Sequence, residues 1–143
     1  MIGDLFNKDR PVFVRFDDDK FIIGKQRRDQ LHGVITDMMP VRKRFEENNL
    51  VCSSPDGING KHGQRCALCT QRWSCAERLR LMMLLDQLEQ TPIPAILEIG
   101  HGSFRALDQF LDDIADDSLR EATVAISIER HEGHLRFAFQ KAN

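Results

Sequence analysis

The sequence predicts an α+β domain built on a mostly antiparallel sheet or a small barrel, with two helices. Two observations support this fold class. Short runs of alternating apolar and polar residues lie toward both ends of the chain, and two apolar-rich stretches with helix-start signals lie between them. At 143 residues the chain is long enough to bury a core as one domain over residues 1–143, and it shows no internal repeat.

Three stretches near the N-terminus are rich in β-branched and aromatic residues and are bounded by turn residues or proline, which is typical of strands. They are Pro11–Phe16, Phe21–Ile23 and Leu31–Met38. We expect the third strand to end before Pro40, because proline cannot donate to a strand ladder. The next segment, Val41–Phe45, is either a fourth short strand or the edge of a basic loop.

Two helices are expected in the second half of the chain. Ser74 and Glu77 have the spacing of a capping box, and the apolar-rich run behind them predicts a helix through Leu88. Ser103 is placed to cap a second helix, on which five apolar residues recur at helical spacing. These residues are Phe104, Leu107, Phe110, Leu111 and Ile114.

Further strands are expected around the second helix. Ile96–Ile99 predicts a strand between the two helices. After the second helix, Thr123–Ile128 and Leu135–Phe139 both alternate, and His131–His134 supplies a turn between them. This pattern predicts a hairpin that closes the domain.

Composition favours a water-soluble globular protein, with 41% hydrophobic and 29% charged residues. The longest apolar stretch, Leu79–Leu88, is interrupted by Arg80 and Asp86 and falls short of the roughly 20 residues that a bilayer span requires. The N-terminus lacks the apolar region of a signal peptide. We therefore expect a cytoplasmic protein with no membrane contact, in which cysteines stay reduced.

All four cysteines lie in one segment with few periodic features, at the spacing Cys52-x13-Cys66-x2-Cys69-x5-Cys75. Four thiolates can complete the tetrahedral shell of one structural zinc ion, so residues 51–76 are expected to form a zinc-binding insertion. An iron–sulfur cluster is the less favoured ligand. His62 replacing one cysteine and buried inert thiols are the remaining interpretations.

Known catalytic motifs do not fit the chain. A zinc deaminase requires His-x-Glu upstream of Pro-Cys-x-x-Cys, whereas Arg65 precedes Cys66 here. His131–His134 is too short for the His-Glu-x-x-His zinc helix. The sequence therefore gives no reason to expect an enzyme.

The net charge of −2 conceals a division of the chain. Residues 20–80 carry 12 Lys and Arg against 6 Asp and Glu, whereas residues 81–143 carry 5 against 11. The basic half favours an anionic partner, most commonly nucleic acid. A solvated surface on which charges segregate without function would explain the same division.

Ten residues of the basic half combine cations that follow phosphates with a ring that can stack on an unpaired base, which suits single-stranded nucleic acid. They are Lys25, Arg27, Arg28, Arg42, Lys43, Arg44, Lys61, Arg65, Arg72 and Trp73. Trp73 is interpreted either as a stacking ring or as a hydrophobic lid over the metal site. Five phenylalanines are assigned to the core instead: Phe13, Phe16, Phe21, Phe137 and Phe139.

The order of these features resembles the zinc-containing single-stranded-DNA-binding proteins of phages and mobile elements. The motif behind the resemblance runs from Cys52-Ser53-Ser54-Pro55-Asp56-Gly57 through Cys66-Ala67-Leu68-Cys69 to Cys75. The resemblance implies an OB-like fold that binds single-stranded DNA in a basic, aromatic cleft, with the zinc subdomain supporting one wall. The chain departs from the T-even phage member, which uses a histidine with three cysteines, and it has no tyrosine.

Taken together, the sequence predicts a non-catalytic single-stranded nucleic-acid-binding protein with a structural four-cysteine zinc site. The alternative is a zinc-stabilised protein-interaction subunit of a larger nucleoprotein assembly. Its docking surfaces would be the zinc loop and the acidic patch of the second helix, formed by Asp112, Asp113, Asp116 and Asp117. The near-zero net charge favours this alternative, whereas the clustering of charge favours nucleic acid.

Overall fold

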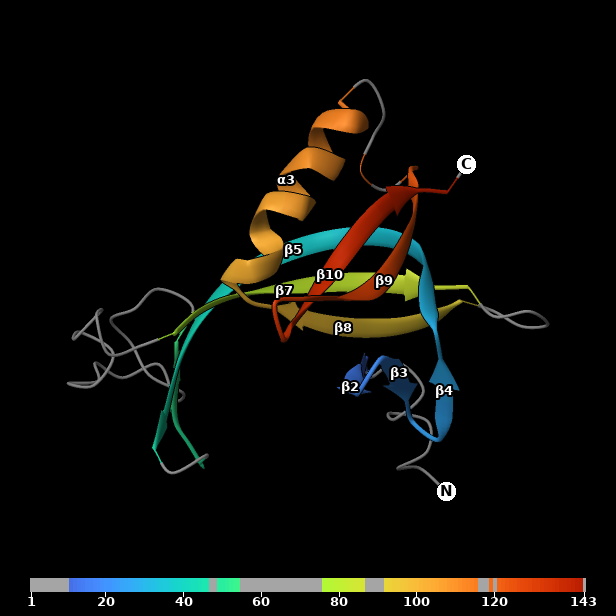
Figure 1. Ribbon diagram of the computed structural model, residues 1–143. Coiled ribbons are helices and arrows are strands. Elements are labelled where there is room, and N and C mark those ends of the chain that lie inside the picture. Colours follow the sequence, from blue (N-terminus) through green and yellow to red (C-terminus); the bar gives the residue numbers. More distant parts are fainter. Residues whose placement is uncertain are drawn as a thin grey trace.

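A computed structural model describes residues 11–46, 49–54, 76–86, 92–115, 119 and 121–142. In this part of the chain the strands form a seven-stranded sheet and a three-stranded sheet, accompanied by one α-helix (Figure 1). The fold is thus mostly sheet, in keeping with the expected small α+β class.

The large sheet has the strand order β1-β8-β7-β5-β9-β10, with β6 paired to β5 outside this path. Its members are β1 (Val12–Phe13), β5 (Gln30–Glu46), β6 (Asn49–Ser54), β7 (Ala76–Leu85), β8 (Ile93–Ile99), β9 (Thr123–His131) and β10 (His134–Lys141). All pairings within it are antiparallel except that of β1 with β8. The described strands follow an open path, so the closed barrel of an OB fold is not present in this part of the chain.

The small sheet consists of β2 (Arg15–Asp17), β3 (Lys20–Ile23) and β4 (Gln26–Arg28). It confirms the strand expected over Phe21–Ile23, which lies in β3. The predicted strand over Pro11–Phe16 is divided between the two sheets, because Val14 separates β1 from β2. The basic run after Gly24 forms β4, which the sequence analysis did not anticipate. Gly24 has φ +59°, a left-handed turn conformation that favours glycine.

The prediction that Pro40 ends the third strand was wrong, since β5 continues through it to Glu46. β7 pairs with β5 on one side along its length, including Pro40 opposite Leu79. On the other side β9 pairs only as far as Val34 and β6 begins only at Arg42. Proline is tolerated in a strand at a position where one edge has no partner. At Pro40 none of the described strands pairs with the second edge of β5, so the strand can continue through the proline.

The helix expected from Ser74 through Leu88 was also wrong, because this segment holds β7. Leucine, methionine and arginine favour helices, and that propensity suggested the helix. The decisive pattern is the period of two in Arg78-Leu79-Arg80-Leu81. Burial keeps the same period to the end of the strand, with Leu81, Met83 and Leu85 buried. β5 and β8 pair with β7 on its two sides, so every second side chain enters the core. Cys75 therefore directly precedes a strand in the sequence.

The second predicted helix is confirmed as α3 (Phe104–Asp113), preceded by the 3-10 turn η2 (His101–Ser103). Leu107 and Phe110 are buried on the expected face. Ser103 occupies the N-cap position, but its hydroxyl makes no capping hydrogen bond. Instead Ser103 Oγ accepts a hydrogen bond from the Phe137 backbone N–H at 2.9 Å and ties the start of α3 to β10.

The predicted C-terminal hairpin is confirmed by β9 and β10, which pair from His131 opposite His134 to Val124 opposite Lys141. Glu132 and Gly133 form the turn with φ +51° and +82°, the left-handed pair that a two-residue hairpin favours. The strand expected at Ile96–Ile99 is confirmed as β8, although it starts earlier, at Ile93.

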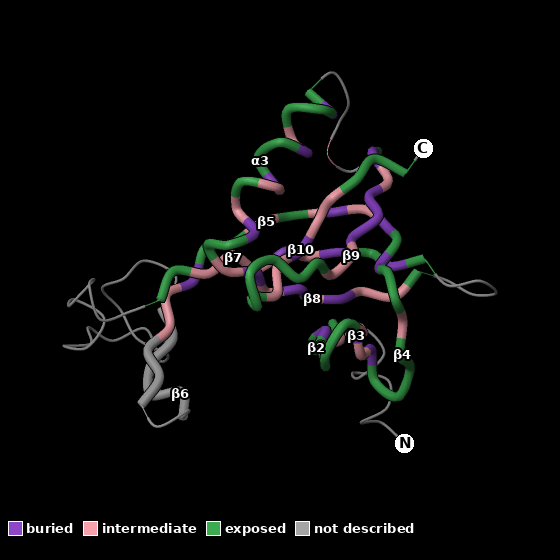
Figure 2. The backbone as a smooth tube through the Cα atoms, in the orientation of Figure 1, coloured by how far each residue is buried: buried purple, intermediate pink, exposed green. Residues whose placement is uncertain are grey.

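The core lies where the inner faces of the large sheet, the small sheet and α3 meet (Figure 2). Phe21 of the small sheet is fully buried and stacks on Phe137 of β10, with ring centroids 5.6 Å apart. Phe110 and Ile114 bring the apolar face of α3 into the same cluster. No helix in the described part of the chain is long and apolar enough to cross a membrane.

Candidate nucleic-acid interface

Three cations from two strands converge on one carboxylate at the β5–β7–β8 end of the large sheet. Lys43 Nζ lies 2.7 Å from Glu98 Oε2. Arg78 Nε donates to Glu98 Oε1 at 2.8 Å, and Arg80 Nε donates to Glu98 Oε2 at 3.2 Å. Three positive charges therefore meet one negative charge, which leaves an excess of two.

The strand register explains why these side chains meet. Residues directly opposite each other in neighbouring strands project from the same face of a sheet. Arg80 lies opposite Glu98 on one side and opposite Met39 on the other, and Arg78 is two residues away on the same face. We call this face, with Lys43, Arg78, Arg80, Glu98 and Phe13, the basic outer face. Leu79 and Leu81 alternate with the two arginines and point to the core side.

The side chain of Glu98 is only 11% exposed, and that of Lys43 only 12%. Burial alone raises the pKa of Glu98. The hydrogen bond and positive charge of Lys43, with further contributions from Arg80 and Arg78, outweigh it and hold the pKa below the ordinary value of 4.5. Glu98 therefore remains ionised at neutral pH and keeps the cations in place.

Glu98 also orients the two guanidinium groups. Both arginines reach it through Nε, and a guanidinium has further N–H donors on its terminal nitrogens. Among the described contacts, no hydrogen bond occupies those terminal nitrogens. The outer face thus presents pre-positioned donors of the kind that bind phosphate oxygens.

An aromatic ring lies beside these donors. Phe13 of β1 is 47% exposed, and the Arg80 guanidinium carbon is 5.5 Å from its ring centroid. Met39 and Leu84 are also exposed on this face, each at 37%. An exposed ring next to an oriented cation is the pairing that single-stranded nucleic acid uses for base stacking and backbone contact.

A pocket of about 460 Å³ lies between α3 and the adjoining ends of β5 and β7. Its lining consists of Pro40, Val41, Arg42, Glu77, Arg78, Leu79, Phe104, Leu107 and Asp108. Arg78 belongs both to this lining and to the Glu98 cluster. Arg42 and Glu77 face each other across the β5–β7 pair and project from the same side as Leu79, opposite to the basic outer face. Opposite charges therefore meet at the pocket.

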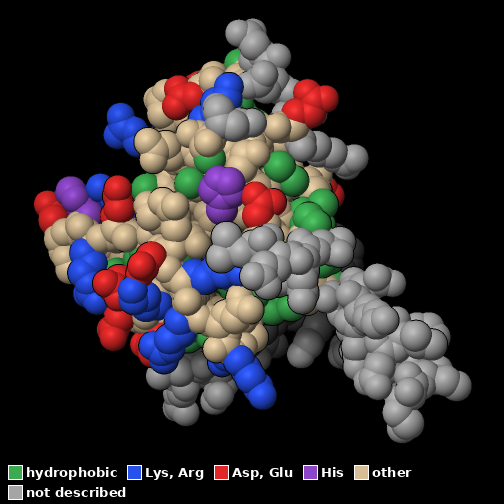
Figure 3. Space-filling view, turned by 90° about the vertical axis from the view of Figure 1, so that its right-hand side faces the viewer, with side chains coloured by type: hydrophobic (Ala, Val, Ile, Leu, Met, Phe, Trp, Pro, Cys, Tyr) green, Lys and Arg blue, Asp and Glu red, His purple; other side chains and the backbone are tan. Residues whose placement is uncertain are grey.

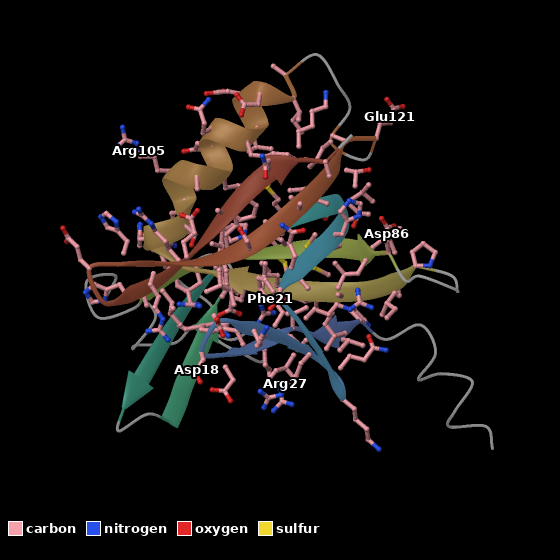
Figure 4. All side chains as sticks on the ribbon, turned by 45° about the vertical axis from the view of Figure 1, so that its right-hand side comes forward. Asp18, Phe21, Arg27, Asp86, Arg105 and Glu121 are labelled. Atoms are coloured by element: carbon pink, nitrogen blue, oxygen red, sulfur yellow. The ribbon has the colours of Figure 1, made fainter. Side chains whose placement is uncertain are left out.

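The predicted nucleic-acid residues Arg27 and Arg28 lie on β4 of the small sheet, and Lys25 lies in the turn before it. Cations and carboxylates are mixed in this region. Arg27 Nη2 is 3.7 Å from Asp17 Oδ2, and both side chains are more than half exposed. Arg28 donates through Nη1 to the Asp86 carbonyl oxygen at 3.1 Å and through Nη2 to Gln26 Oε1 at 3.0 Å. Figure 4 shows Arg27 pointing away from the body of the protein, whereas Phe21 points into it.

Other ion pairs around the small sheet reinforce this mixing of charge. Lys20 pairs with Asp29, whose hydrogen bond and charge raise the pKa of Lys20. Arg130 Nη2 of β9 lies 3.8 Å from Asp18 Oδ1. Figure 3 shows Lys and Arg side chains interspersed with Asp and Glu on one face of the protein.

The remaining predicted residues divide into two groups. Arg42 and Lys43 lie on β5, and Arg44 is paired through its backbone with Cys52 of β6. The structure thus brings Lys43 to the Glu98 cluster and Arg42 to the pocket, but leaves the Lys25 group on a different sheet. Lys61, Arg65, Arg72 and Trp73 lie outside the described residues.

The predicted zinc ligands fall almost entirely outside the described part of the chain. Cys66, Cys69 and Cys75 are outside it, and only the backbone of Cys52 is described, on β6. Within the described residues no three His, Cys, Asp or Glu side chains are grouped closely enough to hold a metal ion. The zinc site therefore stays a prediction from cysteine spacing.

Glu98 was not predicted as a site residue, and two phenylalanines were wrongly assigned to the core. Phe21 and Phe137 are buried as expected, and Phe139 packs against the core. Phe13 and Phe16 are 47% and 43% exposed, so their assignment to the core was wrong. For Phe13 the available signal was alternation, because Val12 and Val14 flank it and Val14 is the buried residue. Glu98 gave no local signal, since its three partners are 18 or more residues away in sequence.

No protein-family model matches this chain, and no curated protein or solved structure shows significant similarity to it. The chemistry of the described residues is therefore the basis for a functional assignment.

Proposed function

We propose that the protein binds single-stranded nucleic acid without catalysing a reaction, and that four cysteines hold one structural zinc ion beside the binding surface. The observation that carries the proposal is the basic outer face, where Lys43, Arg78 and Arg80 surround one carboxylate next to the exposed ring of Phe13. An excess of two positive charges suits a phosphate backbone, and the ring suits an unpaired base.

The geometry favours a single strand over a duplex. Phe13 is an exposed side chain on the edge strand β1 of an extended sheet, where a splayed base can reach it. Bases within a duplex are stacked on one another and cannot offer a face to such a ring. The OB-like barrel and DNA as the particular ligand are finer parts of the proposal, and both come from the sequence resemblance. Binding on the outer face depends on neither.

The proposed zinc site adjoins this surface along the chain. Cys75 directly precedes β7, which carries Arg78 and Arg80, and the backbone of Cys52 is paired with β5 beside Lys43. A metal that fixes this insertion would stabilise the strand ends that present the cations. We expect about one zinc per chain by elemental analysis of reduced protein. If the analysis found iron and the protein showed a visible absorption band, the site would be assigned to an iron–sulfur cluster instead of zinc. If the protein were folded without any metal, the proposed site would be contradicted.

The principal test is a titration with labelled single-stranded and duplex oligonucleotides at two salt concentrations. The proposal expects tighter binding to the single strand and an affinity that falls as salt rises, because neutralised phosphates release counterions. Equal affinity for the duplex would argue against base stacking. If no oligonucleotide binds at low salt, the nucleic-acid proposal fails.

A protein-interaction subunit is the second candidate, and one observation favours it. Phe13, Met39 and Leu84 are large apolar side chains exposed on the same outer face. Grouped apolar exposure is also a feature of protein-binding surfaces. Failure to bind any oligonucleotide, together with protection of the cysteine segment from proteolysis by a protein partner, would establish this alternative.

A further inference from the structure

We propose that the pocket between α3 and the β5–β7 strand ends receives one unpaired base of the bound strand, and that it favours bases with an exocyclic amino group. This inference rests on the proposed function and specifies the ligand of the pocket that shares Arg78 with the basic outer face. It is carried by the position, size, apolar floor and charged groups of the pocket.

Arg78 links the pocket to the phosphate-binding surface. It lines the pocket while its Nε holds Glu98, although Arg42, Glu77 and Leu79 project from the opposite side of the β5–β7 pair. Nucleic acid bound on the basic outer face therefore has to turn past Arg78 to place a base in the pocket. The volume of about 460 Å³ lies within the range of small-molecule pockets and leaves room for a base with its sugar.

The floor is apolar. Leu107 is only 3% exposed, and Leu79 and Phe104 pack against the core beside it. Phe104 also contacts the His101 ring, with centroids 4.6 Å apart and planes tilted by 49°. This contact restricts the orientation of the Phe104 ring, which reduces the entropy lost when a base stacks on it.

The polar groups of the lining determine which base fits. The carboxylate oxygens of Glu77 and Asp108 accept hydrogen bonds, whereas Arg42 and Arg78 can only donate them. Cytosine, adenine and guanine carry an amino group that donates to a carboxylate, and they offer ring nitrogens or carbonyls to an arginine. In thymine and uracil two carbonyl oxygens flank the single N–H group. A carboxylate repels these oxygens, so the two bases fit less well beside Asp108 or Glu77.

The two carboxylates differ in how they are held. Glu77 Oε2 lies 3.7 Å from His101 Nε2. Asp108 is exposed on α3 and, among the described residues, its side chain has no hydrogen-bond or ion-pair partner. Asp108 is therefore the carboxylate that can turn toward a base without breaking an existing contact.

The experiment compares a thymine-only strand with the same strand carrying a cytosine at every third position. The full-length protein is expected to bind the cytosine-containing strand about tenfold more tightly, the size of effect that one well-placed base contact provides. Asp108→Asn should remove most of that preference. Asp112→Asn is the matched control, because Asp112 lies one turn further along α3 and outside the pocket lining.

A second measurement locates the base. A strand carrying 5-iodocytosine, irradiated in the complex and analysed by mass spectrometry, should crosslink to Phe104. Equal affinity for the two oligonucleotides, or an unchanged preference in Asp108→Asn, would overturn the pocket assignment. The proposed binding of single-stranded nucleic acid would still stand. Crosslinking only to Phe13 would overturn the pocket assignment as well and open the pocket to another ligand. If neither strand binds at low salt, both the proposed function and this inference fail.

Discussion

The two sheets carry their charges in different ways. On the large sheet, Glu98 is nearly buried and gathers three cations from β5 and β7. On the small sheet, Arg27 pairs with Asp17 at 3.7 Å in a largely exposed setting. Exposed ion pairs contribute little to stability and are screened by salt, whereas a shielded carboxylate fixes the geometry of its partners. The same residue types therefore give a positioned site on one sheet and a solvated surface on the other.

Replacing the central carboxylate should have the largest effect on this contrast. Glu98→Gln leaves three cations around a neutral amide, and removing one partner of a shielded ion pair costs about 3 kcal/mol of unfolding free energy. Asp17→Asn, the matched change on the small sheet, should cost at most about 1 kcal/mol. Urea denaturation of both variants provides the comparison, and equal losses would mean that the Glu98 cluster is no more than a surface network.

Adding a methyl group to a glycine in each region tests the packing. A Cβ on Gly33 of β5 would come within 2.1 Å of the Leu84 carbonyl oxygen, a backbone atom that cannot move aside. Gly33→Ala should therefore cost about 3 kcal/mol, the upper end for an overpacked site. Gly24→Ala meets no atom within 4 Å and should cost about 1 kcal/mol, through its positive φ alone. Thermal unfolding that ranked the two variants in the opposite order would show that β5 can shift locally.

Removing one arginine from each region sharpens the functional side of the comparison. Arg80→Ala should lower the logarithmic salt slope of single-strand binding by about 0.7, the share of one phosphate. Arg27→Ala should change it less, because Asp17 already offsets that charge. Fluorescence titrations over a range of salt measure both slopes, with circular dichroism to check the fold. An equal loss in Arg27→Ala would extend the interface to the small sheet.

Acid should produce the smallest difference between the two regions. The lowered pKa of Glu98 gives stability that is complete above its unfolded value near 4.5 and is lost as the pH falls toward the folded value. Measured from neutral pH into acid, the advantage of the wild type over Glu98→Gln should therefore stay constant until about pH 4.5 and shrink below it. A constant difference between wild type and Glu98→Gln across this range would contradict the assigned role of Glu98.

The local sequence pattern was sufficient to predict the elements that short-range interactions define. The hairpin follows from alternation on both sides of Glu132-Gly133, and α3 follows from apolar residues at helical spacing. The acidic turn before β3 has the same origin, since Asp18 takes a left-handed conformation that short polar side chains tolerate. In each case a few neighbouring residues contain the necessary information.

The tertiary structure decided what depends on distant partners. β7 consists of good helix formers, yet hydrogen bonding to β5 and β8 on its two sides makes it a strand. Pro40 remains in β5 because only one of the described strands pairs with β5 at that point. The meeting of Lys43 with Glu98 depends on a register that joins three strands, and backbone pairing over such separations leaves no trace in local spacing. The sequence by itself thus determined the turns, the helix and the cysteine cluster. The basic outer face and the pocket beside α3 form only when the strands pair, because their residues come from distant parts of the chain.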